Sequence, residues 1–251
     1  MEKAARSPKS SLILAALIAA MILLLALNVV QSYAGLEGFS FWGYPYVRSF
    51  FEDPDNPIKM KKISCPPFIG LDESKLVSVS LTNTANRNVN AFFQAVVSSP
   101  DSEYGAVHII REVPLQRGET RIETVEINSS NIVDNKYILL RSFMSWQPVY
   151  VSSRSIACQS VVIPFRNINS NLVGYGIYVL LTSATILLAI LYRKHDPLAI
   201  RTGRSRSSLV YIVVVLLLMT IGNLTGTWIL SFSMIVMIVL GFLAFWQVDF
   251  R

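Results

Sequence analysis

Two cysteines and two histidines are the residues in this chain best suited to metal or redox chemistry, and their spacing argues against both. Cys65 and Cys158 are the only cysteines, and no Cys-x-x-Cys motif is present. His108 and His195 are far from each other in the sequence, whereas a metal centre usually takes three or four ligands. The sequence therefore predicts no metal site and no cofactor.

Catalytic signatures of other kinds are missing as well. The chain lacks the glycine pattern of a nucleophile elbow and the Gly-x-x-x-x-Gly-Lys phosphate loop. The interiors of its apolar stretches carry no Asp, Glu, Lys, Arg or His, which ion and proton pathways generally require at membrane depth. We therefore expect neither an enzyme nor an active transporter.

The overall composition indicates a membrane protein. Of 251 residues 52% are hydrophobic and 15% are charged, with a mean hydropathy of +0.47, whereas a soluble domain carries about 25% charged residues. Residues 31–171 hold 13 acidic and 13 basic residues, and the rest of the chain holds nine basic and three acidic ones. The surplus flanks apolar segments, which is the positive-inside pattern and argues against nucleic-acid binding.

Four apolar segments set the expected topology, an integral membrane α + β fold with four transmembrane helices. An immunoglobulin-like β-sandwich is expected outside the cytoplasm, between helices 1 and 2. The expected order is a cytoplasmic N-terminus 1–11, helix 12–30, an aromatic-rich interfacial segment 31–57, the sandwich 58–166, helix 172–192, a basic cytoplasmic loop 193–208, helix 209–222, helix 228–246 and a cytoplasmic C-terminus 247–251.

Two parts of this topology have alternatives. Residues 12–30 are read as an uncleaved signal anchor, because the uncharged run exceeds the usual 7–15 residues of a signal peptide core, although Ser32-Tyr33-Ala34 offers a cleavage site. The alanines at 15, 16, 19 and 20 allow close helix approach or are simply common helix residues. Residues 222–226 are expected to form the turn of the last pair, which is otherwise a shallow re-entrant hairpin.

The aromatic-rich segment 31–57 has glycines and a proline that argue against a regular long helix. Amphipathic rings favour the membrane interface, and exposed rings also mark contacts with partner subunits. The third alternative is packing under the neighbouring domain. The candidate contact residues are Phe39, Phe41, Trp42, Tyr44, Tyr46, Phe50 and Phe51.

From residue 58 to 165 the hydrophobic period changes to two, which is typical of strands with one buried face. The expected strands are 76–83, 89–97, 106–111, 121–127, 137–143, 149–152 and 156–163. Seven short strands in about 100 residues fit a β-sandwich.

Three passages of this region resemble the CARDB-type group of bacterial immunoglobulin-like domains. They are VSVSLTNTANRNVNAFFQAVVSS, VPLQRGETRIETVEI and KYILLRSFMSW, within about residues 75–146. The resemblance implies a sandwich used for adhesion, spacing or subunit contact, and it brings no catalytic residues.

Cys65 and Cys158 bracket the expected sandwich on the side that the charge pattern places outside the cytoplasm. We expect a disulfide between them; the alternative is a pair of buried free thiols. In the basic loop, the residues expected to contact anionic lipid are Arg193, Lys194, Arg201, Arg204 and Arg206.

The functional expectation is a non-catalytic accessory or structural subunit of a larger membrane complex. The expected partners are the lipid bilayer and other membrane subunits, in a hetero- or homo-oligomer. Its location is expected to be a bacterial plasma membrane, with both termini in the cytoplasm. The alternative is a membrane-anchored binding, adhesion or sensory module. Residues 31–171 are expected outside the cytoplasm in either case.

Overall fold

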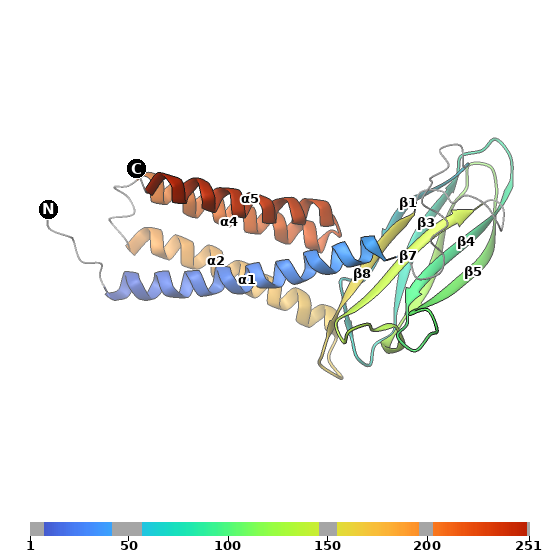
Figure 1. The fold of residues 1–251 in the computed structure, drawn as a ribbon, viewed down its shortest axis with the longest axis horizontal. Coiled ribbons are helices and arrows are strands. Elements are labelled where there is room, and N and C mark those ends of the chain that lie inside the picture. Colours follow the sequence, from blue (N-terminus) through green and yellow to red (C-terminus); the bar gives the residue numbers. More distant parts are fainter. Residues whose placement is uncertain (1–7, 42–56, 146–154, 196–202, 250–251) are drawn as a thin grey trace. The chain divides into compact units, whose positions relative to one another are not determined.

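The computed structural model describes residues 8–41, 57–145, 155–195 and 203–249. Its helices are α1 (Pro8–Ser40), α2 (Ser170–His195), α4 (Gly203–Leu224) and α5 (Trp228–Asp249), with a short 3-10 helix η1 (Ser129–Asn131). Its strands all lie between α1 and α2 in the sequence (Figure 1): β1 (Ile58–Ser64), β2 (Phe68–Gly70), β3 (Lys75–Asn83), β4 (Val89–Ser98), β5 (Ala106–Leu115), β6 (Thr120–Ile127), β7 (Tyr137–Ser145) and β8 (Ile156–Ile163).

The strands form two sheets that share one core. A three-stranded sheet has the order β1-β3-β6, and a five-stranded sheet has the order β2-β8-β7-β4-β5. All pairings are antiparallel except β2 with β8, which are parallel. Alternate residues of both sheets, such as Val77, Val79 and Leu81 on β3 and Ala91, Phe93 and Ala95 on β4, are fully buried in a single hydrophobic cluster. The arrangement is sandwich-like, because each sheet buries one face against the other.

Six of the seven predicted strands correspond to strands of the structure, and 149–152 lies outside the described residues. The sequence prediction missed β1 and β2. In β1 the register shifts between Met60 and Lys62, so the alternation breaks after two buried residues. Strand β2 has only three residues, and all of them are buried, so it shows no period.

Asn83 joins two turns of the chain, the one after β3 and the one between β5 and β6. Its side-chain amide donates to the carbonyls of Arg87, Leu115 and Gln116, at 2.9, 3.3 and 2.9 Å. Its backbone N–H donates to the carbonyl of Glu119 at 2.9 Å. A buried asparagine thus holds the end of β3 against the β5–β6 turn.

The first helix corrects the expectation for residues 33–40, which are helical rather than irregular. A glycine costs a helix only about 1 kcal/mol relative to alanine, and Gly38 has a packing role. A Cβ built on Gly38 would lie 3.1 Å from the Cys158 carbonyl oxygen. The glycine therefore allows α1 to lie against β8.

The last two helices are joined by a tighter turn than predicted, because Gly222, Asn223 and Leu224 still belong to α4. Gly226 has φ +73°, a left-handed conformation that favours glycine. The N–H of Thr227 donates to the carbonyl of Gly222 at 2.8 Å. The helix end is therefore capped by backbone hydrogen bonds.

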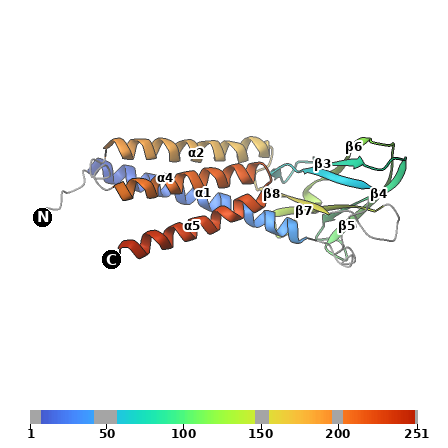
Figure 2. The same cartoon turned by 90° about the horizontal axis from the view of Figure 1, so that it is seen from above.

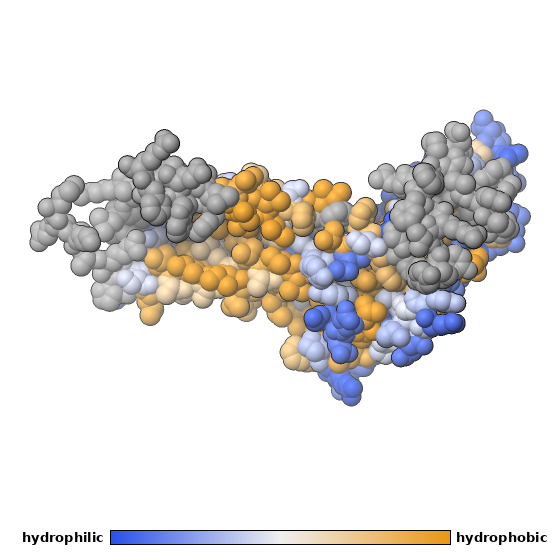
Figure 3. All heavy atoms as spheres, viewed as in Figure 1, coloured by the Kyte–Doolittle hydropathy of each residue, from blue (hydrophilic) through white to orange (hydrophobic). Residues whose placement is uncertain are grey.

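The chain divides into two compact units, one of residues 1–32 and 175–251 and one of residues 33–174. In the first unit the helices run alongside one another (Figures 1 and 2), and hydrophobic side chains cover much of their surface (Figure 3). Among the described residues, α1 and α2 are long and apolar enough to cross a membrane. Helix α1 also lies near the N-terminus, where a signal sequence has similar length and composition.

Candidate functional site

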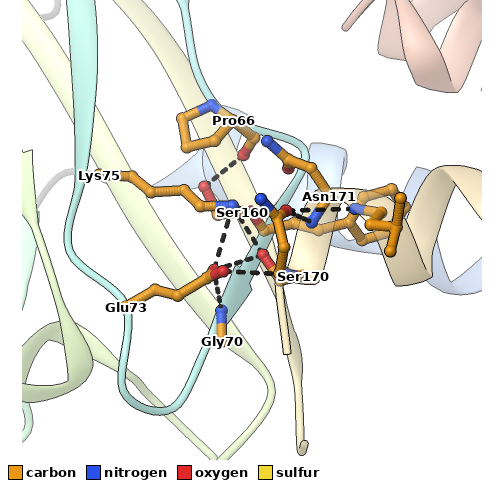
Figure 4. Close-up of polar contacts among 10 residues, drawn as sticks. Pro66, Gly70, Glu73, Lys75, Ser160, Ser170 and Asn171 are labelled. Atoms are coloured by element: carbon orange, nitrogen blue, oxygen red, sulfur yellow. Dashed lines mark hydrogen bonds and ion pairs between the residues drawn. The ribbon is translucent and has the colours of Figure 1, made fainter. Parts of the chain in front are cut away.

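A polar cluster of the second unit lies where α2 begins (Figure 4). Ser170 is fully buried at the first position of α2, and Glu73 and Lys75 come from the β2–β3 loop and the start of β3. The Lys75 ammonium lies 2.6 Å from the Ser170 hydroxyl and 3.1 Å from the Glu73 carboxylate. The Ser170 hydroxyl donates to Glu73 at 2.5 Å. Two neighbouring charged side chains and a serine more than 90 positions later thus form one hydrogen-bonded group.

Glu73 caps the N-terminus of α2 from outside the helix. Its carboxylate accepts the backbone N–H groups of Ser170, at 2.9 Å, and Gly70, at 2.7 Å. Desolvation raises the pKa of this carboxyl, but hydrogen bonds from Ser170, Gly70 and Lys75 outweigh it and lower the pKa to about 2. An ionised carboxylate at this position is favourable, because the first N–H groups of a helix have no partner within it and carry a partial positive charge.

A second cap comes from Asn169, whose side-chain oxygen accepts the N–H groups of Asn171 and Leu172 at 3.0 and 3.2 Å. Phe68 of β2 packs against Gly174, where a Cβ would overlap the phenyl ring. The first turn of α2 is therefore held by hydrogen bonds and by close packing.

A serine beside a lysine resembles the nucleophile and base of some hydrolases, in which a neutral lysine takes the serine proton. Here the Lys75 ammonium is paired with the Glu73 carboxylate at 3.1 Å. The Ser170 hydroxyl already donates to Glu73, and its side chain is fully buried. The arrangement fits a structural junction between the start of α2 and the β2–β3 loop.

The opposite kind of cap closes the end of α1. Arg141 of β7 is only 5% exposed, and its guanidinium donates to the backbone carbonyls of Phe39 and Phe41 and, at 2.7 Å, to the Ser155 hydroxyl. It also lies 5.8 Å from the centre of the Phe39 ring. The last carbonyls of a helix carry a partial negative charge, so a cation there is stabilising.

The predicted disulfide joins Cys65 and Cys158, whose Cα atoms are 6.1 Å apart. It links the segment after β1 to the middle of β8. Next to it the Ser160 hydroxyl donates to the Pro66 carbonyl at 2.6 Å (Figure 4). The disulfide is typical of an oxidising compartment outside the cytoplasm.

A third polar group lies inside the helical unit, between α1 and α4. The Asn223 amide donates to the backbone and side-chain oxygens of Asn28 at 3.0 and 2.8 Å. Asn28 donates to the Thr220 hydroxyl at 2.9 Å, and Ser32 donates to Asn223 at 3.1 Å. Tyr178 of α2 is buried with its hydroxyl beside the Asn223 side chain. All these polar groups are buried, and they connect three helices.

The predicted contact aromatics are only partly described. Phe41 packs against the β-sheet core, which is the third alternative given for this segment, and Phe39 is half exposed beside Arg141. Trp42, Tyr44, Tyr46, Phe50 and Phe51 lie outside the described residues.

The predicted lipid-contact residues lie around the α2–α4 connection. Arg193 and Lys194 occupy the last turn of α2, where cations are favourable. Arg204 and Arg206 fall in the first turn of α4, and Arg201 lies outside the described residues. Their contact with lipid stays a prediction.

Within the described ranges, no group of three or more His, Cys, Asp or Glu side chains is placed to hold a metal ion. His108 lies on β5, where desolvation lowers the pKa of its imidazole. His195 ends α2. The two histidines thus belong to different units.

The sequence prediction missed the residues of all three polar groups. Glu73, Lys75 and Arg141 look like ordinary surface charges in the sequence, because their helix partners lie about 100 positions away. Asn28 and Asn223 carried a usable signal: an amide in an apolar helix needs a partner, and two such amides suggest each other.

No protein-family model matches the chain, and no curated protein matches it. Similar solved structures include a β-glucosidase from Erythrobacter marinus, with 15% identity over 42% of this chain and 15% of the enzyme, at a TM-score of 0.33. Another is an alkylpurine DNA glycosylase from Pseudomonas fluorescens, with 13% identity over 41% of this chain and 30% of the enzyme, at a TM-score of 0.31. The chain thus matches less than a third of either enzyme.

A third similar structure is the CARDB domain of a Pyrococcus furiosus protein, solved in complex with di-metal ions. It has 13% identity over 47% of this chain and 100% of that domain, at a TM-score of 0.35. A CARDB domain is therefore among the structures similar to this chain, as the sequence resemblance predicted.

Proposed function

We propose that this protein is a non-catalytic accessory or structural subunit of a larger membrane complex. The observation that carries the proposal is a pair of charged helix caps. The two sheets β1–β8, called the β domain below, supply Glu73 to the start of α2 and Arg141 to the end of α1. The caps fix the domain relative to the adjoining helix turns, and a subunit that braces an outer surface requires such a fixed relation.

In the proposed topology all four helices span the bilayer, with both termini in the cytoplasm and residues 31–171 outside. Helices α4 and α5 have 22 residues each, about 33 Å at 1.5 Å per residue. Their apolar stretches, Ser208–Leu224 and Ile229–Gly241, are the parts proposed to lie in the hydrocarbon core. The basic residues around the ends of α1, α2 and α4 fit the cytoplasmic side. A bacterial plasma membrane is the proposed location.

Partner subunits are proposed because the helical unit exceeds what anchoring requires. Helices α1 and α2 already hold both ends of the β domain, and the α4–α5 hairpin adds exposed apolar side chains such as Val236, Val239 and Leu240. The Asn28–Asn223 hydrogen bonds hold this hairpin beside α1, so it offers a fixed surface to a neighbouring membrane protein.

A photo-crosslinking amino acid placed at Leu240 tests this proposal in native membranes. We expect discrete adducts with other membrane proteins, and co-migration with them on native gels after mild detergent extraction. The matched control carries the crosslinker at Tyr104, an exposed residue of the β4–β5 loop. Migration of the chain as a lone 28.0 kDa protein, with only lipid adducts at Leu240, would refute the proposal.

A binding or sensory module is the second candidate, favoured by the outer face of the three-stranded sheet. Leu76 and Ile122 are both more than 60% exposed there. Replacing both by serine in the full-length, nanodisc-reconstituted chain should abolish retention on immobilised cell-surface polysaccharide if this face binds it. If the variant and the wild type are retained equally, this face does not bind the polysaccharide, and the subunit proposal is the one that remains.

A further inference from the structure

The connection between β8 and α2 exposes large apolar side chains. Every residue from 164 to 169 is exposed, and two of them are Phe165, 53% exposed, and Ile168, 46% exposed. Leu172, in the first turn of α2, is 73% exposed. These three residues and Arg166 are called the linker patch below.

The linker patch is presented by a fixed backbone. Asn167 has φ +59°, a left-handed conformation that asparagine tolerates better than most residues. Its N–H donates to the Asp72 carboxylate at 2.7 Å. Three residues later Ser170 is bound to Glu73. Exposed apolar side chains on such a held loop are not explained by packing within the domain.

The position of the linker patch next to α2 determines how deep it lies in the bilayer. Residues 172–192 carry no charge, and as a helix of 1.5 Å per residue they extend about 31 Å, close to the thickness of the hydrocarbon core. Leu172 then lies at the outer boundary of that core. Residues 165–168 fall within the headgroup layer, which adds roughly 5–8 Å on each side.

We propose that the linker patch is an interfacial anchor that inserts into the phospholipid headgroup layer next to α2. Phe165 and Ile168 enter the boundary with the acyl chains, and the Arg166 guanidinium faces lipid phosphates. The chemistry fits, because aromatic, aliphatic and arginine side chains are favoured at this depth. The anchor rests on the proposed span of α2 and adds a second membrane contact to the β domain.

A lipid partner suits the patch better than a protein partner. Three apolar side chains are a small surface, whereas a specific protein interface generally buries more than about 1,000 Å². The patch is also continuous with α2, whose exposed side chains are themselves apolar, such as Val179 and Leu180. Insertion continues the lipid-facing surface of the helix outwards.

The test is site-directed spin labelling of the full chain in vesicles of phosphatidylcholine and phosphatidylglycerol. Both native cysteines are in the disulfide, so one introduced cysteine is the sole labelling site. The test variant is Ile168→Cys, with Phe165→Cys as its substitute if labelling disturbs folding. The controls are Ile110→Cys, exposed on β5, and Val179→Cys, exposed on α2.

We expect the label at 168 to be several-fold less accessible to a water-soluble nickel complex than the label at 110, and more accessible to oxygen. Equal nickel accessibility at 168 and 110, with the label at 179 shielded, would overturn the anchor and leave the span of α2 standing. Nickel access at 179 would refute the span itself.

Discussion

Glu73 and Arg141 show how single charged side chains replace the hydrogen bonds that helix ends lack. Each lies in the β domain, and each serves the end of a helix with the opposite partial charge. Leaving such end groups buried without partners is costly, because an unsatisfied buried polar group costs about 1–3 kcal/mol. The two caps therefore stabilise the junctions as well as orienting them.

Acid should weaken the α2 junction through Glu73. The pKa of this carboxyl is about 2 in the folded chain and 4.5 ordinarily, so its contribution to stability is fully present above pH 4.5 and is lost as pH falls towards 2. Glu73→Gln should lower the unfolding temperature at pH 7. The difference in unfolding temperature between this variant and the wild type should become smaller as the pH falls from 4.5 towards 2.

The measurement is thermal unfolding of the detergent-solubilised chain between pH 7 and pH 2.5. Glu112→Gln is the matched control, because Glu112 is an exposed carboxylate on β5. A gap between Glu73→Gln and wild type that stays constant over the whole range would contradict the assigned pKa.

The asparagine pair should behave as one unit. Asn28→Leu removes the side-chain oxygen that accepts from the Asn223 amide. Asn223→Leu removes the donor to both Asn28 oxygens and the acceptor of the Ser32 hydroxyl. Each change should reduce the free energy of unfolding by about 0.6–2 kcal/mol, the usual range for hydrogen bonds between membrane helices.

Denaturation by sodium dodecyl sulfate, followed by circular dichroism, measures these losses. The double variant should lose less than the sum of the two single variants, because both remove the same interaction. Ser233→Ala, which removes only a bond to the preceding turn of α5, is the control and should change little. Strict additivity would mean that the two amides act independently.

At the scale of elements, the second turn of α2 depends on one glycine and tolerates another. Gly174 faces the buried Phe68 ring, and Gly176 faces open space. Gly174→Ala should destabilise the domain by about 1–3 kcal/mol through overpacking, whereas Gly176→Ala should be neutral or slightly stabilising.

Thermal unfolding of the two variants, two residues apart on one helix, gives a matched comparison. Adding Phe68→Leu should restore part of the stability lost in Gly174→Ala, because the smaller side chain makes room for the methyl group. Equal unfolding temperatures for both alanine variants would show that β2 and α2 are not closely packed.

The elements that the sequence predicts well are those with a clean period. Strands β3, β4 and β8 alternate between buried and less buried residues, so their hydrophobic pattern survives in the sequence. Strand β1 escapes detection because its bulge shifts the pattern, and β2 because three buried residues have no period. Helix α1 extends past its predicted end because contact of Gly38 with β8 outweighs a low helix propensity.

The candidate site was less predictable than the fold, for a physical reason. Its hydrogen bonds join residues brought together only by the complete topology, such as Glu73 with Ser170. A charge in a turn and a serine before an apolar run are common features separately. The disulfide was predictable because only two cysteines exist and both belong to the same expected compartment.

At the scale of the whole molecule, the disulfide should mark the side on which the β domain resides. Chain taken from intact membranes should react with a thiol-specific polymer reagent only after reduction, as judged by gel mobility. Reaction without reduction would contradict an oxidising location.

The disulfide should also stabilise the fold. In the chain-entropy model, closing a loop with a separation of 93 residues stabilises the folded state by about 4–5 kcal/mol. Replacing both cysteines by serine should therefore lower the unfolding temperature strongly.

The parallel pairing of β2 with β8 imposes an order of events on synthesis. Phe68 has its strand partner at Val161, so β2 stays without its neighbour until nearly the whole domain has left the ribosome. Hairpins such as β4–β5 pair residues much closer in sequence and can form earlier. The nascent chain therefore has to keep Cys65 and β2 available, with α1 already made, until β8 arrives, and α2 follows directly behind it.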